Sequence, residues 1–97
     1  MRLIKFGAPW CTSCKRMAPI IKQLAGTFNI PLEDVDIKSK LGITLAGYGM
    51  VQSLPTVILI TDKETPLSEL TEQSFSGSKA ARGEFTFAQL KKMLDFT

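Results

Sequence analysis

The 97-residue chain contains no histidine and only two cysteines, Cys11 and Cys14. A structural zinc site needs four ligands, usually cysteine and histidine, so one chain alone cannot form such a site. Only a site shared by two chains would have enough ligands. In a cytoplasmic protein, a lone cysteine pair is more often redox-active or metal-binding than a structural staple.

Long apolar runs are also missing. No run approaches the roughly 20 residues that a membrane-spanning helix needs. The N-terminus is positively charged, but Lys5 interrupts the apolar run that a secretory signal peptide requires. The hydrophobic fraction of 44% and the charged fraction of 22% are ordinary for a globular protein. We therefore expect a soluble cytoplasmic protein with one domain over residues 1–97 and no membrane contact.

Acidic residues are absent from the first third of the chain. Residues 1–32 hold five basic side chains and no carboxylate, and the first acid is Glu33. The net charge of +3 is too small to indicate nucleic-acid binding. Two interpretations of the asymmetry stand: chance on a solvated surface, or a positive field around Cys11 that favours a thiolate and an acidic partner surface.

The hydrophobic pattern predicts alternating strands and helices. Strands are expected at residues 2–7, 31–37 and 56–60, and helices at about 12–28, 41–48 and 86–94. Pro19 lies inside the first helix and predicts a kink rather than a break. Gly42 and Gly47 weaken the second helix. Thr86 and Gln89 match a capping box at the start of the last helix.

A fourth strand completes the expected sheet. Residues 67–75 alternate weakly and predict an antiparallel edge strand, and residues 76–85 predict a polar loop. Strand, helix and strand at the N-terminus form a βαβ unit, whose strands are parallel. The predicted order is β-α-β-α-β-β-α, an α/β fold with a four-stranded mixed sheet flanked by helices.

The cysteines form a C-x-x-C motif at the start of the first helix. Unpaired backbone N–H groups and the positive end of the helix dipole stabilise a thiolate there, and they lower a cysteine pKa from about 8.5 to roughly 3.5–7.5. Cys11 is then the attacking thiolate, and the more buried Cys14 resolves the mixed disulfide. Lys15 and Arg16 add positive charge nearby, although the helix could point either side chain away from the sulfurs. The alternative is that the two thiols are inert.

These residues resemble the thioredoxin family. The match consists of the stretch 8–15 (Ala-Pro-Trp-Cys-Thr-Ser-Cys-Lys), Pro19, Tyr48-Gly49, Leu54-Pro55-Thr56 at the start of a strand, and the C-terminal helix. Order and spacing agree over nearly the whole chain. The family's additional N-terminal strand and helix are missing, which leaves the minimal thioredoxin fold that glutaredoxins also use.

The resemblance implies a set of substrate-binding residues. Pro55 would be a cis-proline facing the dithiol, with the backbone of Leu54 pairing with the substrate; the alternative is a trans proline that begins a strand. Trp10 would shield the disulfide and offer an apolar contact; the alternative is a core aromatic. Gly83 would complete the docking groove. Thr12 and Ser13, between the cysteines, would also contact the substrate.

The chain departs from the family pattern at positions that tune the chemistry. Thr12-Ser13 replaces the family's Gly-Pro between the cysteines, so the reduction potential cannot be inferred. Lys5 stands where the family has a buried acid beneath the second cysteine. We hypothesise that Lys5 stabilises a thiolate by its charge or acts as a neutral base; the alternative is that it points to solvent. Ser53 and Met50 alter the segment before Pro55.

The resemblance implies a dithiol–disulfide oxidoreductase without a cofactor that reduces protein disulfides as a monomer. Thioredoxin reductase or glutathione would recycle it, and ribonucleotide reductase would be one client. Two alternatives are a glutathione-dependent glutaredoxin and a thioredoxin-fold binding module whose thiols are incidental. A periplasmic oxidant is disfavoured because no signal peptide precedes the motif.

Overall fold

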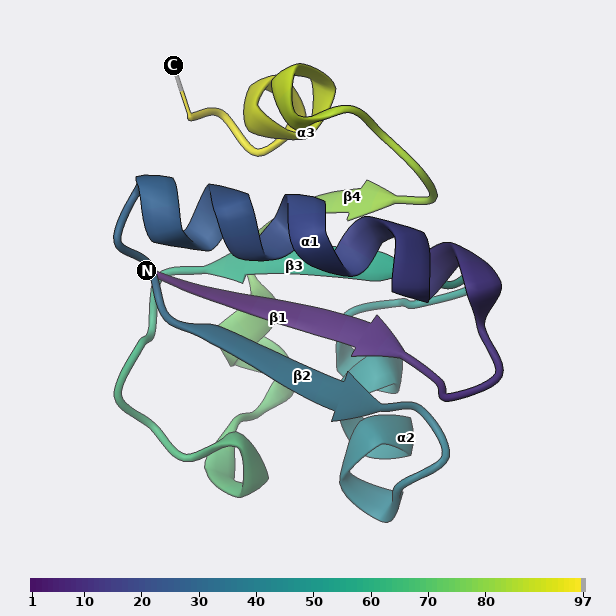
Figure 1. Ribbon diagram of the computed structural model, residues 1–97. Helices are drawn as coiled ribbons and strands as arrows, with labels where there is room; N and C mark the ends of the chain where they lie inside the picture. Colours follow the sequence, from purple (N-terminus) through teal and green to yellow (C-terminus); the bar gives the residue numbers. More distant parts are fainter. Residues whose placement is uncertain (97) are drawn as a thin grey trace.

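A four-stranded mixed sheet forms the centre of the computed structural model, which describes residues 1–96 (Figure 1). The strands are β1 (Arg2–Gly7), β2 (Leu32–Asp36), β3 (Thr56–Ile60) and β4 (Lys79–Arg82), and the helices are α1 (Thr12–Thr27), α2 (Lys40–Tyr48) and α3 (Phe87–Met93). The spatial order is β2-β1-β3-β4. β1 and β2 are parallel, and the other two pairs are antiparallel. The predicted α/β fold with a mixed sheet is confirmed.

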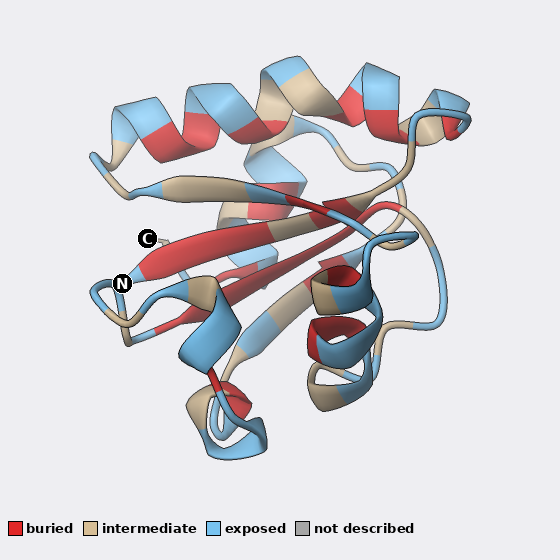
Figure 2. Ribbon diagram, turned by 90° about the horizontal axis from the view of Figure 1, so that it is seen from below, coloured by how far each residue is buried: buried red, intermediate tan, exposed pale blue. Residues whose placement is uncertain are grey.

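Helices cover both faces of the sheet. α1 and α3 lie on one face and α2 on the other (Figure 1). Side chains alternate along β1, so Leu3 joins the core under α1 and α3, whereas Ile4 and Phe6 join the core under α2. Figure 2 shows the buried residues on the strands and on the helix surfaces that face them. The central strand β3 is buried along its whole length, as its continuous apolar run predicts.

The apolar stripe of α1 explains its length and position. Met17, Ile21 and Leu24 are at most 2% exposed, and they recur at the spacing of one helical face. α1 is one continuous helix with Pro19 inside it. The capping box predicted for α3 is present, with Thr86 and Gln89 each accepting a hydrogen bond from the other's backbone. Within residues 1–96, no helix is long and apolar enough to cross a bilayer.

The predicted position of the fourth strand is wrong. Residues 67–75 contain two short 3₁₀ helices, η1 (Leu67–Glu69) and η2 (Glu72–Phe75), that pack on the α2 face. The fourth strand is β4, inside the segment 76–85 that was expected to be a loop. Its residues have low strand propensity, but they pair with β3, and Ala81 is small enough to lie under α1 and α3. Tertiary pairing thus outweighs local propensity.

Candidate active site

The two cysteines form a disulfide at the N-terminus of α1, with their Cα atoms 5.2 Å apart. Cys11 is the N-cap residue, and its sulfur accepts a hydrogen bond from the Cys14 backbone N–H at 3.1 Å. This bond satisfies one of the N–H groups that a helix leaves unpaired at its start. Cys11 is 7% exposed and Cys14 is 4% exposed. No residue in the first turn of α1 is acidic, so the helix itself places no carboxylate at the positive end of its dipole.

The loop before β3 lies beside Cys11. The Leu54–Pro55 peptide bond is cis, which is the geometry that the resemblance implies. Leu54, Cys11 and Trp10 line one open hollow together with Ile37 and Val51, which we call the Trp10 hollow. Trp10 is 62% exposed, so it is a surface residue and the core alternative is wrong. The disulfide therefore borders an exposed apolar surface.

Gly83 lies next to the cis-proline. Its backbone N–H donates to the carbonyl oxygen of Pro55 at 2.9 Å, which ties the segment after β4 to the loop before β3. Its φ of +101° is a conformation that only glycine adopts without strain, and the space around its Cα is open. Gly83 is thus held against the cis-proline, and its role in a docking groove stays a prediction.

An ion pair that the sequence did not reveal joins this segment to the C-x-x-C motif. Glu84 accepts two hydrogen bonds from Arg16, at 2.6 and 3.1 Å, and one from the Ser13 hydroxyl at 3.2 Å. The Arg16 hydrogen bond holds the pKa of Glu84 below its usual value, and the same bond raises the pKa of Arg16. We call these three residues the Glu84 clamp.

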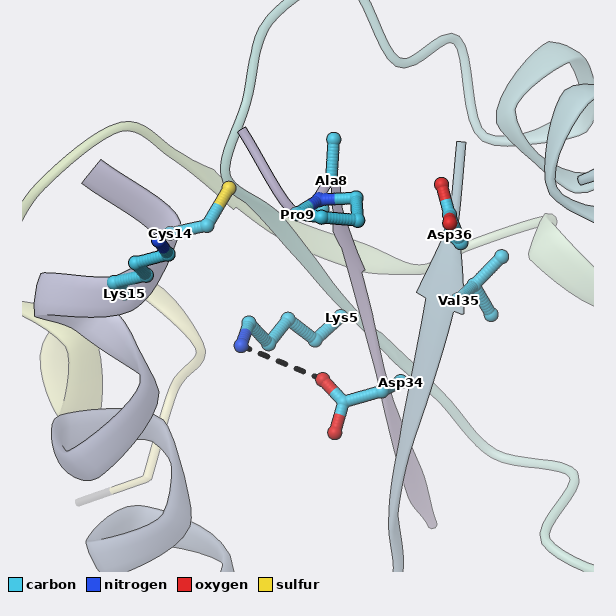
Figure 3. A pocket seen from close by; sticks show the side chains of 9 residues that line it. Lys5, Ala8, Pro9, Cys14, Lys15, Asp34, Val35 and Asp36 are labelled. Carbon is cyan, nitrogen blue, oxygen red and sulfur yellow. Dashed lines mark ion pairs between the residues drawn. The ribbon is translucent and has the colours of Figure 1, made fainter. Parts of the chain in front are cut away.

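A second hollow lies beneath Cys14, on the α1 face of the sheet (Figure 3). Its charged lining consists of Lys5 from β1, Lys15 from α1, and Asp34 and Asp36 from β2. The Lys5 ammonium pairs with Asp34 at 3.4 Å, and the Lys5 side chain is only 14% exposed. Lys5 therefore does not point freely to solvent. We call this pocket the Lys5 hollow.

The structure places Lys5, Cys14 and Lys15 at the Lys5 hollow, and Trp10, Cys11 and Leu54 at the Trp10 hollow. Of the other predicted site residues, Thr12 is exposed between the cysteines, Ser13 belongs to the Glu84 clamp, and Pro55 and Gly83 line neither hollow. Asp34 and Glu84 were missed, and Arg16 was expected only as a nearby positive charge. For Asp34 a signal existed, because parallel pairing of the first two strands sets Lys5 opposite Asp34. For Glu84 none existed, since it lies 68 residues from Arg16 in a segment expected to be a loop. Among residues 1–96, no group of three or more potential metal ligands occurs.

Comparisons with known proteins place this geometry in a family. The family model described as Thioredoxin matches residues 1–83. The thioredoxin of Bacillus subtilis is 36% identical over 62 residues, which cover 64% of this chain and 60% of that protein. The thioredoxin of Staphylococcus haemolyticus is 31% identical over 64 residues, which cover 66% of this chain and 62% of that protein. The chain thus spans less than two thirds of the length of these relatives.

Solved structures agree on the fold. Thioredoxin 1 from Thermosipho africanus superposes with a TM-score of 0.70 at 24% identity, covering 99% of this chain and 92% of that chain. Mitochondrial thioredoxin 3 from Saccharomyces cerevisiae, in its oxidised form, also gives a TM-score of 0.70, at 22% identity and with 98% and 76% coverage.

Proposed function

The chain belongs to the thioredoxin family, and on that premise we propose that it is a dithiol–disulfide oxidoreductase that reduces protein disulfides. The observation that carries the proposal is the Cys11–Cys14 disulfide at the N-terminus of α1, with Cys11 as N-cap. After reduction, the Cys14 N–H and the helix dipole favour the thiolate of Cys11. Family membership and the cysteine pair both support this chemistry.

The reaction proceeds in two exchanges. The Cys11 thiolate attacks one sulfur of the substrate disulfide, and the other substrate sulfur leaves as a thiolate with the electron pair. Cys14 then loses its proton and attacks the Cys11 sulfur of the mixed disulfide. The second substrate thiolate leaves, and Cys11 and Cys14 are joined. Two electrons pass to the substrate, whose two thiolates take up protons from water.

Substrate binding is assigned to the surface around the Trp10 hollow. Trp10 and Leu54 offer apolar contact next to Cys11. The backbone of Leu54, before the cis-proline Pro55, pairs with an extended segment of the substrate, and Gly83 completes the groove. Thr12 and Ser13 complete the rim between the cysteines. The shared hollow supports the assignments of Trp10 and Leu54, and the other assignments follow from the resemblance.

The reductant and the client of the protein are proposed from the family resemblance. We assign recycling to thioredoxin reductase or glutathione in the cytoplasm, where both reductants operate, and a monomer suffices for the chemistry. Ribonucleotide reductase is one client that the family resemblance implies.

The test uses insulin, whose reduced chains precipitate and scatter light. The reduced protein is expected to accelerate insulin reduction by dithiothreitol, and a Cys11→Ser variant is expected to lose the effect. Supplying NADPH with thioredoxin reductase, or glutathione alone, then identifies the reductant. If the wild-type protein and the Cys11→Ser, Cys14→Ser double variant behave alike, the proposed activity is wrong and the thiols are incidental.

A further inference from the structure

The two sulfurs of the disulfide border different hollows. Cys11 borders the Trp10 hollow, whose side chains are apolar or neutral. Cys14 borders the Lys5 hollow, whose lining includes two lysines and two aspartates. The residues of the motif therefore face different electrostatic environments, although they are three positions apart.

Lys5 is close enough to Cys14 to act on it. A Cβ placed on Gly7 would lie 3.3 Å from the Cys14 sulfur and 4.0 Å from the Cε of Lys5. These distances place the Cys14 sulfur within about 7 Å of the Lys5 Cε, and therefore within about 9 Å of the ammonium nitrogen one bond further out. At that separation a charge in a partly buried site still acts on a neighbouring thiolate. Because Gly7 has no side chain, nothing from this position fills the space between them. In Figure 3 the Lys5 side chain runs from β1 toward α1.

Asp34, on the neighbouring strand β2, partly neutralises the charge of Lys5. It is the register partner of Lys5 on β2, and its carboxylate forms the ion pair that Figure 3 marks. Asp34 is 65% exposed, whereas Lys5 is mostly buried. The other charged groups of the hollow are Lys15, which is exposed on α1, and Asp36, whose carboxylate accepts a hydrogen bond from the Lys38 N–H.

From this arrangement we infer that the Lys5–Asp34 pair controls the second exchange: Lys5 stabilises the Cys14 thiolate, and Asp34 limits that stabilisation. The inference rests on the proposed function. The Cys14 thiol loses its proton to water in the open hollow, and its electron pair forms the bond to the Cys11 sulfur. The bond between Cys11 and the substrate sulfur breaks, and that sulfur leaves with its electron pair and takes a proton from water.

Stopped-flow reaction of the reduced protein with the chromogenic aryl disulfide DTNB separates the two exchanges. The first coloured thiolate appears when Cys11 attacks, at a rate proportional to DTNB concentration. The second appears when Cys14 resolves the mixed disulfide, at a rate independent of it. Lys5→Met is expected to slow the second phase about three- to tenfold at neutral pH, because fewer Cys14 thiolates form. The difference disappears at alkaline pH, where the thiol is ionised in both proteins.

Asp34→Asn is expected to change the rate of the second phase in the opposite direction. The asparagine oxygen can still accept from Lys5, but the negative charge is gone, so the second phase is expected to accelerate. Lys5→Arg keeps the charge and is expected to retain the wild-type rate. Lys79→Met is the matched control, since it removes a lysine that is ion-paired with Asp95 outside the hollow.

The outcomes are distinct. An absent first phase in the wild-type protein contradicts the proposed function itself. A normal first phase with a second phase that Lys5→Met leaves unchanged overturns the inference. Slowing by both Lys5→Met and Asp34→Asn also overturns it, because that pattern indicates a structural role without charge control. Equal slowing by Lys79→Met attributes the effect to net charge and likewise contradicts it.

Discussion

Two glycines of α2 should respond in opposite ways to substitution by alanine. A Cβ on Gly42 would overlap the carbonyl oxygen of Asp36 and lie 2.8 Å from the Ser39 hydroxyl oxygen. That hydroxyl caps α2 by accepting from the Gly42 N–H at 2.9 Å. A Cβ on Gly47 would meet nothing within 4 Å. Gly42 is therefore required where α2 docks against the end of β2, whereas Gly47 only lowers helix propensity.

The magnitudes follow from these contacts. Overpacking at Gly42 costs about 1–3 kcal/mol and loss of the Ser39 cap about 1 kcal/mol, against a propensity gain of about 1 kcal/mol. Gly42→Ala is thus expected to lower the free energy of unfolding by about 1–3 kcal/mol. Gly47→Ala is expected to raise it by about 0.5–1 kcal/mol. In a domain of this size, each kcal/mol shifts the melting temperature by about 4–8 °C.

Urea unfolding followed by circular dichroism, with the disulfide intact in every sample, measures both changes. If Gly42→Ala stabilises the protein as much as Gly47→Ala does, the close approach of α2 to Asp36 is wrong. If Gly47→Ala has the same free energy of unfolding as the wild-type protein, only the argument from helix propensity is contradicted.

Three further predictions concern single side chains. Hydrogen bonds from Thr65 hold the pKa of Asp62 at about 2, so the folded state binds fewer protons than the unfolded one in acid. The free energy of unfolding should therefore fall as the pH is lowered from 4 to 2, and in acid unfolding curves the decrease should be smaller for Asp62→Asn. Trp10→Ala should raise the KM for insulin severalfold and leave the DTNB rate unchanged, because only a protein substrate needs the exposed ring; equal effects on both would contradict this. Glu84→Gln breaks the ion pair with Arg16 and should raise the KM for insulin, because the Glu84 clamp also holds Ser13 at the substrate-binding rim. The melting temperature should not fall, since the pair is exposed; a large loss of stability would contradict this.

The sequence predicted the elements whose signals are local. The apolar stripe of α1, the continuous run of β3 and the capping box of α3 each lie within a few residues, and each is present. The cysteine motif is equally local, so its place at a helix N-terminus was also predicted. These features need no knowledge of what they pack against.

Features that depend on distant partners were missed. β4 has a weak local pattern and forms because β3 offers it a partner. Gly42, expected only to weaken its helix, is needed because the Asp36 backbone lies against it. The ion pair of Lys5 was missed because its partner, Asp34, comes from the neighbouring strand. Local pattern carries no information about such contacts, except where strand register can be inferred.

Trapping of the mixed disulfide identifies which cysteine attacks the substrate. The reduced Cys14→Ser variant is mixed with insulin, and the products are separated without reductant and mapped by mass spectrometry. We expect a stable adduct through Cys11, which dithiothreitol reverses, and little adduct with the Cys11→Ser variant. An adduct that forms as well through Cys14 in the Cys11→Ser variant, or no adduct in either, would contradict the assignment of Cys11 as the attacking thiolate.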